Sequence, residues 1–330
     1  MTRPLEQYPR ASFLDPEGDE AIAARAVALD AHLLGQFGEG WESMKAVIPP
    51  QHQGAVRAKD LWAFYLLAVS SAKKLQTFEN TLHSIAQSKA LVAPPFVELA
   101  MLKSPAGSLS ASVLASHPAI VEDLASSWHP SWMGARVVPA DQVSPEEIAH
   151  IGNALALIEK ASPHAASLVG EVCSVICLLR TEGGNLSPGS CISLTSKLVP
   201  SLIYFTPAPV LMTAESIVHE AAHLWLSRLE TVTEMYADPS RIVSSPLRPD
   251  PRPLTGLMHQ VWVLSNLVPF YHELSKCELP VIQTNAAKIS KRLDQHTSDL
   301  RSGLTILSEN LDTLTGRGRL FAESLISHQT

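Results

Sequence analysis

The chain has 330 residues, of which 46% are hydrophobic and 17% charged, so it can bury a sizeable core as one large domain or two smaller ones. Its formal net charge of −7 comes without a cluster of lysine and arginine, which argues against a nucleic-acid partner. No apolar run reaches the roughly 18 residues that a membrane span requires, and the N-terminus lacks the apolar segment of a signal peptide. We therefore expect a cytoplasmic protein with no membrane partner, and free, buried thiols at its four cysteines.

The first part of the chain predicts a helical region, which we place at residues 1–145, before a second region at residues 146–330. Helical patterns are predicted at residues 20–34, at residues 59–87 as one long helix or two broken ones, and at residues 93–102. Proline and glycine then interrupt the pattern, apart from a short helix expected at residues 119–126. This part carries no recognisable chemistry and serves either as a peptide-binding domain or as scaffold. The two regions form either separate domains or one continuous domain.

The second region begins with a clear helix signal. Ser144 is followed by Pro145, Glu146 and Glu147, which combine a capping side chain, a proline at the first helical position and acidic residues in the first turn. This sequence predicts a helix that continues through residue 160.

The remaining elements alternate between strand and helix patterns. Residues 166–180 are rich in Val, Ile and Cys and fit either a strand or a buried helix. Two short strands and two further helices are predicted at residues 191–194, 202–206, 255–274 and 279–314, the last as one helix or a helical hairpin. Residues 244–253 are proline-rich and expected to be extended. We expect a mainly α (α+β) protein, a helical bundle with a small antiparallel sheet beside the helix described next.

Residues 212–235 predict an uninterrupted, largely apolar helix that carries His219-Glu220-Ala221-Ala222-His223. Because one helical turn takes 3.6 residues, His219 and His223 lie on the same face and can present two imidazoles to one metal ion. Glu220 is then placed to take a proton from metal-bound water. The same pattern occurs by chance in helical proteins, where polar neighbours satisfy the histidines. The apolar setting favours a metal here, because one ion gives all three side chains a partner.

A useful metal site needs a third protein ligand. Glu230 lies on the same helix but about 10 Å along its axis from His223, too far to share a metal. Among the carboxylates that follow, Glu234, Asp238 and Glu273 remain possible ligands. We favour His259, since it lies on the next apolar helix, where an unpaired imidazole would be costly.

Two segments together carry a resemblance to a known family. After the H-E-x-x-H motif, the chain contains Arg248-Pro249-Asp250-Pro251-Arg252-Pro253-Leu254 and then Gly256-Leu257-Met258-His259. This combination resembles the H-E-x-x-H-motif peptide-modification family, whose members are encoded near ribosomally made peptides that are modified after translation. Leu247 stands where the common pattern of the family has tryptophan. The resemblance implies that His219, His223 and His259 are the metal ligands, and it links the chain to iron- and 2-oxoglutarate-dependent β-hydroxylation of peptide residues.

Two chemistries fit such a site. In the oxidative one, Fe(II) leaves positions open for 2-oxoglutarate and O₂, and Arg248 and Arg252 are candidates to clamp a carboxylate, although both also fit an ordinary solvated loop. The usual iron-oxygenase ligand set includes a carboxylate in place of a third histidine. In the hydrolytic alternative, Zn²⁺ polarises a peptide carbonyl, Glu220 is the general base, and the strand at residues 202–206 aligns an extended peptide.

A third interpretation is a structural metal site or a binding module without catalysis. Glu220 argues against it, because a purely structural site does not need this carboxylate. We favour the oxidative chemistry on a peptide or carrier-bound amino-acyl substrate. The sequence does not indicate an oligomeric state.

Overall fold

The computed structural model describes residues 98–105, 109–114, 136–140, 142–173, 175–182, 191–195, 202–232 and 234–327. The helices expected at residues 20–34, 59–87 and 119–126 lie outside these ranges. The described part is mostly helical with small sheets, which agrees with the expected α+β class. All four cysteines are free, as expected, but only Cys173 and Cys177 are buried, whereas Cys191 and Cys277 are partly exposed. Among the described helices, none has the length and apolar character needed to cross a membrane.

The larger sheet is mixed, so the prediction of a small antiparallel sheet is wrong. It comprises β1 (Glu98–Lys103), β2 (Ser110–Leu114), β3 (Arg136–Pro139), β4 (Val175–Glu182), β5 (Ser193–Thr195) and β6 (Leu202–Phe205). The strand order is β1-β2-β4-β6-β5, and β3 also pairs with β4. The central strands β2, β4 and β6 are parallel, whereas β1, β3 and β5 are antiparallel to their partners. Parallel neighbours need a long crossover, and the chain between β2 and β4 provides it.

The pairing of these strands corrects two further expectations. The helix expected at residues 93–102 is wrong over its last part, where β1 pairs with β2 from Glu98 to Lys103. The short apolar run of β1 fits either a helix or a strand when taken alone, and its pairing with β2 makes it a strand. β6 is paired on both sides, with β4 and with β5, so it has no free edge on which a peptide could be aligned. Among the described residues, β5 has β6 as its one neighbouring strand.

The helix predicted from Ser144 begins as expected. In α7 (Pro145–Ala161), the Ser144 hydroxyl accepts a hydrogen bond from the Glu147 backbone N–H at 3.2 Å, and the Glu147 carboxylate accepts one from the Ser144 N–H at 2.9 Å. This capping box satisfies two donors that would otherwise be unpaired at the helix start. α8 (Pro163–Val172) follows and leads into β4. Residues 166–180, which fitted either structure, thus contain the end of one helix and most of a strand.

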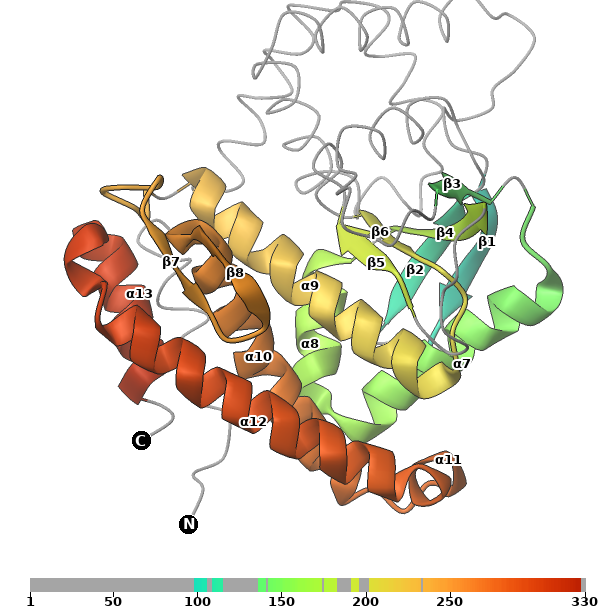
Figure 1. Ribbon diagram of the computed structural model, residues 1–330. Coiled ribbons are helices and arrows are strands. Elements are labelled where there is room, and N and C mark those ends of the chain that lie inside the picture. The colour runs from blue at the N-terminus through green and yellow to red at the C-terminus, as the bar shows by residue number, and fades with distance from the viewer. Residues whose placement is uncertain are drawn as a thin grey trace, which may run out of the picture.

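Helix α9 (Val210–Val232) crosses the middle of the described part and contacts β5, β6, α7, α8 and α10 (Leu254–Ser275) (Figure 1). Two indole N–H groups link α9 to neighbouring helices through hydrogen bonds. Trp262 Nε1 on α10 donates to the Ala222 carbonyl at 3.0 Å, and Trp225 Nε1 on α9 donates to Glu171 Oε1 on α8 at 3.2 Å. The two indole rings pack with centroids 4.6 Å apart. Large buried rings with satisfied N–H groups hold α9 and α10 in a fixed relative position.

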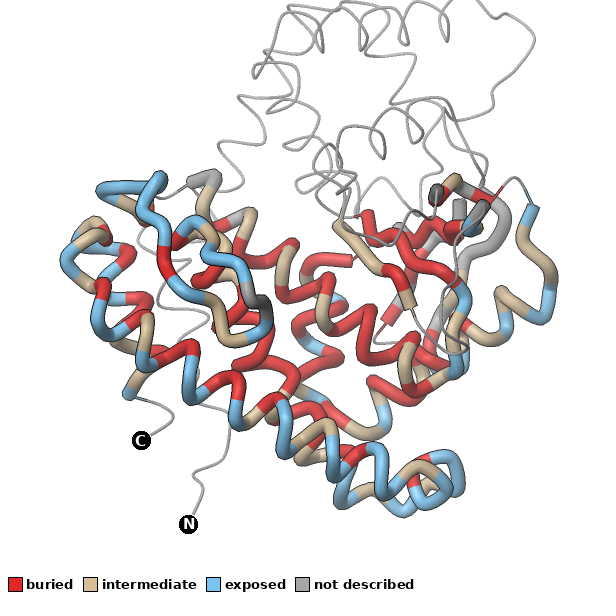
Figure 2. Tube along the Cα trace, in the orientation of Figure 1, coloured by how far each residue is buried: buried red, intermediate tan, exposed pale blue. Residues whose placement is uncertain are grey.

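The rest of the chain packs around α10. A two-stranded sheet, β7 (Ile242–Ser245) and β8 (Arg248–Pro253), directly precedes α10 and includes most of the segment expected to be extended. After α10 come α11 (Pro280–Thr284), α12 (Ala286–Ser308), η2 (Leu311–Thr313) and α13 (Gly316–Ser327), in agreement with the amphipathic helical pattern. Figure 2 shows buried segments along α8, α9 and α10, while α11 and the outer face of α12 are largely exposed.

Candidate functional site

The H-E-x-x-H motif lies on a partly exposed stripe of α9. Within its described side chains from Leu211 to Glu230, those that are not buried are Met212, His219, His223, Ser227 and Glu230. From His219 onward they recur at intervals of three and four residues, which places them along one line of the helix. Glu220 lies off this line and is 3% exposed. Both histidines of the motif therefore face the same side, as their spacing predicts.

Helix α10 places His259 directly against His223. The Nδ1 atoms of the two rings are 3.0 Å apart, and the ring planes are inclined by 25°. Two nitrogens that each lie about 2.1 Å from one metal ion, at a right angle, are separated by about 3.0 Å. The two imidazoles therefore have the spacing of a ligand pair. In the metal-free protein, the same distance makes a hydrogen bond that one Nδ1 donates and the other accepts.

The other nitrogen of His259 is fixed by a carboxylate. His259 Nε2 lies 3.0 Å from Glu230 Oε2, and the Tyr236 hydroxyl donates to Glu230 Oε1. Burial and the adjacent Glu230 carboxylate raise the pKa of Tyr236 above its usual range, so the phenol keeps its proton and remains a donor. With Glu230 accepting at both oxygens, the His259 hydrogen resides on Nε2 and the lone pair of Nδ1 points towards His223.

Glu220 is paired with a residue of the sheet. The Ser193 hydroxyl on β5 donates to Glu220 Oε1 at 2.7 Å, and His219 Nε2 is 3.9 Å from the same oxygen. Burial raises the pKa of Glu220 to about 8, against a smaller opposing effect of the Ser193 hydrogen bond. In the metal-free protein, Glu220 is therefore mostly protonated at neutral pH.

The two histidines of the motif are neutral at physiological pH. Burial lowers the pKa of His219 to about 4, even though 37% of its side chain is exposed. Burial, together with the neighbouring His219 and His259, holds the pKa of His223 well below its usual range. Neutral imidazole is the form that binds a metal ion.

A second polar cluster adjoins His219 on the side of α12. One turn before His219, Glu215 accepts a hydrogen bond from the Tyr271 hydroxyl at 2.5 Å. His296 Nε2 and Arg292 Nη2 on α12 lie 3.4 Å and 3.7 Å from its two oxygens. Burial would raise the pKa of Glu215, but His296 and the charge of Arg292 outweigh it and hold that pKa below its usual value. The cluster places an ionised carboxylate one helical turn from the motif.

The described side chains, as they are arranged, do not form a complete metal centre. Across them, no group of three or more His, Cys, Asp or Glu side chains is arranged to hold an ion. His223 and His259 are at ligand spacing, and the His219 ring lies next to His223 with centroids 4.9 Å apart. Of the alternative third ligands, Glu234 and Asp238 are exposed. The donor set of neutral imidazoles with a carboxylate behind one of them fits a divalent transition metal.

Of the two candidate arginines, the structure places one beside the histidines. Arg252 on β8 lies over the first turn of α10, where a Cβ atom at Gly256 would be 2.5 Å from its Nε. The positive charge of Arg252 contributes to the low pKa of His223. Arg248 begins the same strand, and its side chain lies outside the described part of the structure.

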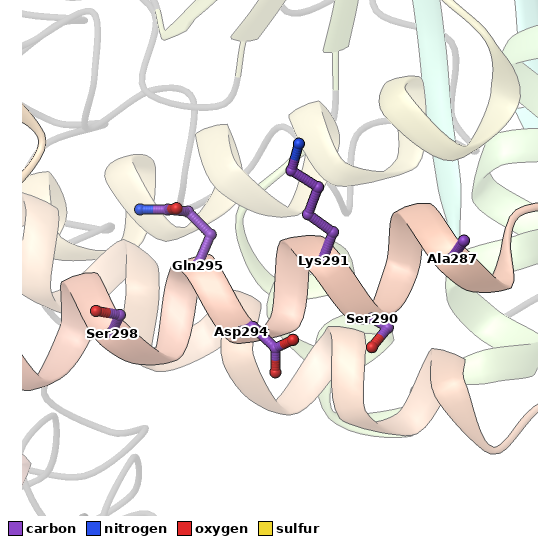
Figure 3. Close-up of a pocket in the computed structure, with 6 residues that line it drawn as sticks. All are labelled: Ala287, Ser290, Lys291, Asp294, Gln295 and Ser298. Atoms are coloured by element: carbon purple, nitrogen blue, oxygen red, sulfur yellow. The ribbon is translucent and has the colours of Figure 1, made fainter.

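A surface pocket of about 570 Å³ is lined by residues of α12 and by none of the candidate site residues. Its lining residues, shown in Figure 3, are Ala287, Ser290, Lys291, Asp294, Gln295 and Ser298. Lys291 extends away from Ser290 and Asp294, so the side chains converge on no common point. We assign this pocket no part in the candidate site.

Three features of the site were not found from the sequence. These are the contacts of Ser193 with Glu220, of Tyr236 with Glu230 and of Glu230 with His259. Each contact links residues that are distant in the chain or belong to different elements. The distance along α9 that separates Glu230 from a metal shared with His219 and His223 does not prevent Glu230 from contacting His259 on α10. The position of Glu230 seven residues after His223, on the same helix face, was the one available signal.

Neither a protein-family model nor a curated protein matches this chain.

Proposed function

We propose that this protein is a metal-dependent enzyme that hydroxylates a peptide or a carrier-bound amino-acyl side chain, with Fe(II) and 2-oxoglutarate as cofactor and co-substrate. His219, His223 and His259 are the proposed ligands of the metal. With 2-oxoglutarate and O₂, the bound iron supplies the oxidising power for inserting oxygen into a C–H bond.

The observation that carries this proposal is the opposed pair of Nδ1 atoms of His223 and His259, 3.0 Å apart. Two imidazole nitrogens this close can serve one divalent ion, iron or zinc, and the preference for iron comes from the family resemblance of the H-E-x-x-H motif and the segment from Arg248 to His259. Glu230 behind His259 adds the carboxylate partner that metal-binding histidines commonly have.

The proposal requires His219 to change its side-chain rotamer when the metal binds. Its ring adjoins that of His223, and 37% of its side chain is exposed, which leaves it room to turn. A metal bound between His223 and His259 would replace the hydrogen bond between their Nδ1 atoms, and the hydrogen of that bond would have to move to the other nitrogen of its ring, which stays neutral.

Arg252 is the proposed clamp for a carboxylate of 2-oxoglutarate. It lies close enough to His223 to lower the pKa of that imidazole, and its guanidinium offers the planar, bidentate geometry that a carboxylate prefers. Glu220, held by Ser193, then serves as a hydrogen-bonding group at the edge of the site.

The hydrolytic alternative is favoured by a different observation. Glu220 lies beside His219 and is linked to β5, which among the described residues pairs with β6 alone. An extended peptide added to β5 would pass close to Glu220, which could take a proton from water in a zinc peptidase. Glu220→Gln separates the two chemistries, because it removes the general base of the hydrolase and leaves the proposed iron ligands intact.

Iron loading and 2-oxoglutarate turnover test the proposal together. We would reconstitute the purified protein with Fe(II) without oxygen, record the charge-transfer absorption on adding 2-oxoglutarate, and then measure oxygen-dependent succinate formation. The wild-type protein and a His272→Ala control on α10 should show both signals, and His223→Ala should show neither. Tightly held zinc without succinate formation would favour the hydrolase, and equal turnover in His223→Ala would refute the proposed ligands.

A further inference from the structure

The segment after α9, which carries Tyr236, is tied to the chain between α12 and α13. Two backbone hydrogen bonds make the connection, from Thr315 N–H to Met235 O at 3.1 Å and from Ala237 N–H to Thr313 O at 3.0 Å, and together they form an antiparallel β-bridge between Tyr236 and Leu314. The Thr315 hydroxyl also donates to the Glu234 carbonyl at 2.5 Å. The residues on both sides of Tyr236 are therefore held by the C-terminal segment (residues 313–318).

Gly318 allows α13 to approach this segment closely. A Cβ atom at Gly318 would lie 1.9 Å from the Met235 carbonyl oxygen, so any larger residue must push the two segments apart. A Cβ atom at Gly316, two residues earlier in the same helix, would meet nothing within 4 Å. The two glycines thus offer a matched pair of substitutions, of which one disturbs the backbone next to Tyr236 and the other does not.

We propose that Tyr236 is a positioning residue for His259, and that the C-terminal segment exists in part to hold it in place. Tyr236 donates to one oxygen of Glu230, and the other oxygen accepts from His259 Nε2 at 3.0 Å. Fixing Glu230 in this way fixes both the orientation of the imidazole and the nitrogen that carries its hydrogen. Its remaining nitrogen then faces His223.

This inference deepens the proposed function, because its consequence for metal binding rests on His259 being a ligand. The hydrogen-bonded chain itself is present without a metal. It can therefore be tested in the metal-free protein, independently of any activity.

The first test is the tautomer of His259 in metal-free protein, measured by ¹⁵N NMR of the imidazole nitrogens. We expect the wild-type protein to hold the hydrogen on Nε2. Tyr236→Phe and Gly318→Ala should shift His259 towards a mixture of tautomers, whereas Gly316→Ala should not. Tyr271→Phe, which removes the equivalent hydrogen bond to Glu215, is the matched control and should also leave His259 unchanged. If His259 in Tyr236→Phe still carries its hydrogen on Nε2 as in the wild type, the proposal is wrong. If Gly318→Ala fails to fold, the result for Tyr236→Phe alone decides whether Tyr236 positions His259.

The second test is the dissociation constant for Fe(II), measured without oxygen on the same variants. Mutation of a direct hydrogen-bond partner of a metal ligand typically weakens metal binding by about 10- to 100-fold, and we take the lower end, about tenfold, for Tyr236, which acts through Glu230. We expect this loss in Tyr236→Phe and Gly318→Ala, with wild-type affinity in Gly316→Ala. Unchanged affinity in Tyr236→Phe would contradict the positioning role. A wild-type protein that binds no metal would refute the proposed function instead, and the tautomer measurement would still decide whether Tyr236 orients His259.

Discussion

Replacing Glu220 by glutamine should change how the stability of the metal-free protein depends on pH. Glu220 is 3% exposed, and burial raises its pKa from 4.5 to about 8. Between these pH values, the folded protein keeps a proton that the unfolded chain has lost. The free energy of unfolding therefore falls as pH rises from 4.5 to 8, and the loss is complete above pH 8. Glutamine resembles the protonated carboxyl in shape and does not titrate.

The size of the effect follows from the pKa values. One pKa unit corresponds to about 1.4 kcal/mol, so a rise from 4.5 to about 8 costs the wild-type protein on the order of 5 kcal/mol above pH 8. At pH 7 the cost is about 3 kcal/mol. Relative to the wild type, Glu220→Gln should thus become steadily more stable with rising pH. The lowered pKa of His219 is common to both proteins and largely cancels in the difference.

Urea unfolding of both proteins in the presence of a chelator, at several pH values from 4 to 9, measures this difference. The two stabilities should lie closest at the acidic end and separate towards pH 8. Parallel curves across the whole range would show that Glu220 does not hold a proton in the folded protein, and would refute the description of its environment.

Two other substitutions test separate parts of the site. Gly256→Ala places a Cβ atom 2.5 Å from Arg252 Nε and should displace that side chain. We expect 2-oxoglutarate binding to the iron-loaded protein to weaken by about tenfold or more. Calorimetric titration measures this affinity, and an unchanged value would exclude Arg252 from the clamp. Tyr271→Phe removes a hydrogen bond to the buried Glu215 carboxylate and should lower the free energy of unfolding by about 1–3 kcal/mol. Urea unfolding is the measurement, and an unaltered midpoint would contradict that cost.

The elements that depend on local patterns were predictable. The capping residues before α7 and the uninterrupted apolar run of α9 define their helices without help from the rest of the chain. The four-residue spacing of His219 and His223 likewise placed both on one face. Strand pairing was not predictable: the local pattern of β1 fits a helix, and no local pattern indicates the parallel order of β2, β4 and β6. These features depend on partners far away in the chain, which no local pattern reports.

The same reason explains which parts of the site were missed. Ser193 reaches Glu220 only because β5 packs against α9, and Glu230 meets His259 only because α10 folds back along α9. The sequence offers residue types for such contacts but not their geometry. The apolar surroundings of His259 in the sequence predict an imidazole in need of a partner, and in the structure its two nitrogens lie 3.0 Å from His223 Nδ1 and 3.0 Å from Glu230 Oε2. Its role as a ligand remains a prediction.

The most direct test of the account is the metal content of His259→Ala. Protein purified without oxygen and loaded with Fe(II) should be compared as wild type, as His259→Ala and as His272→Ala, the control from the same helix. The account predicts near-stoichiometric iron in the wild type and in His272→Ala, and loss of the iron in His259→Ala. Full iron retention in His259→Ala would contradict the three-histidine centre on which the proposed function depends.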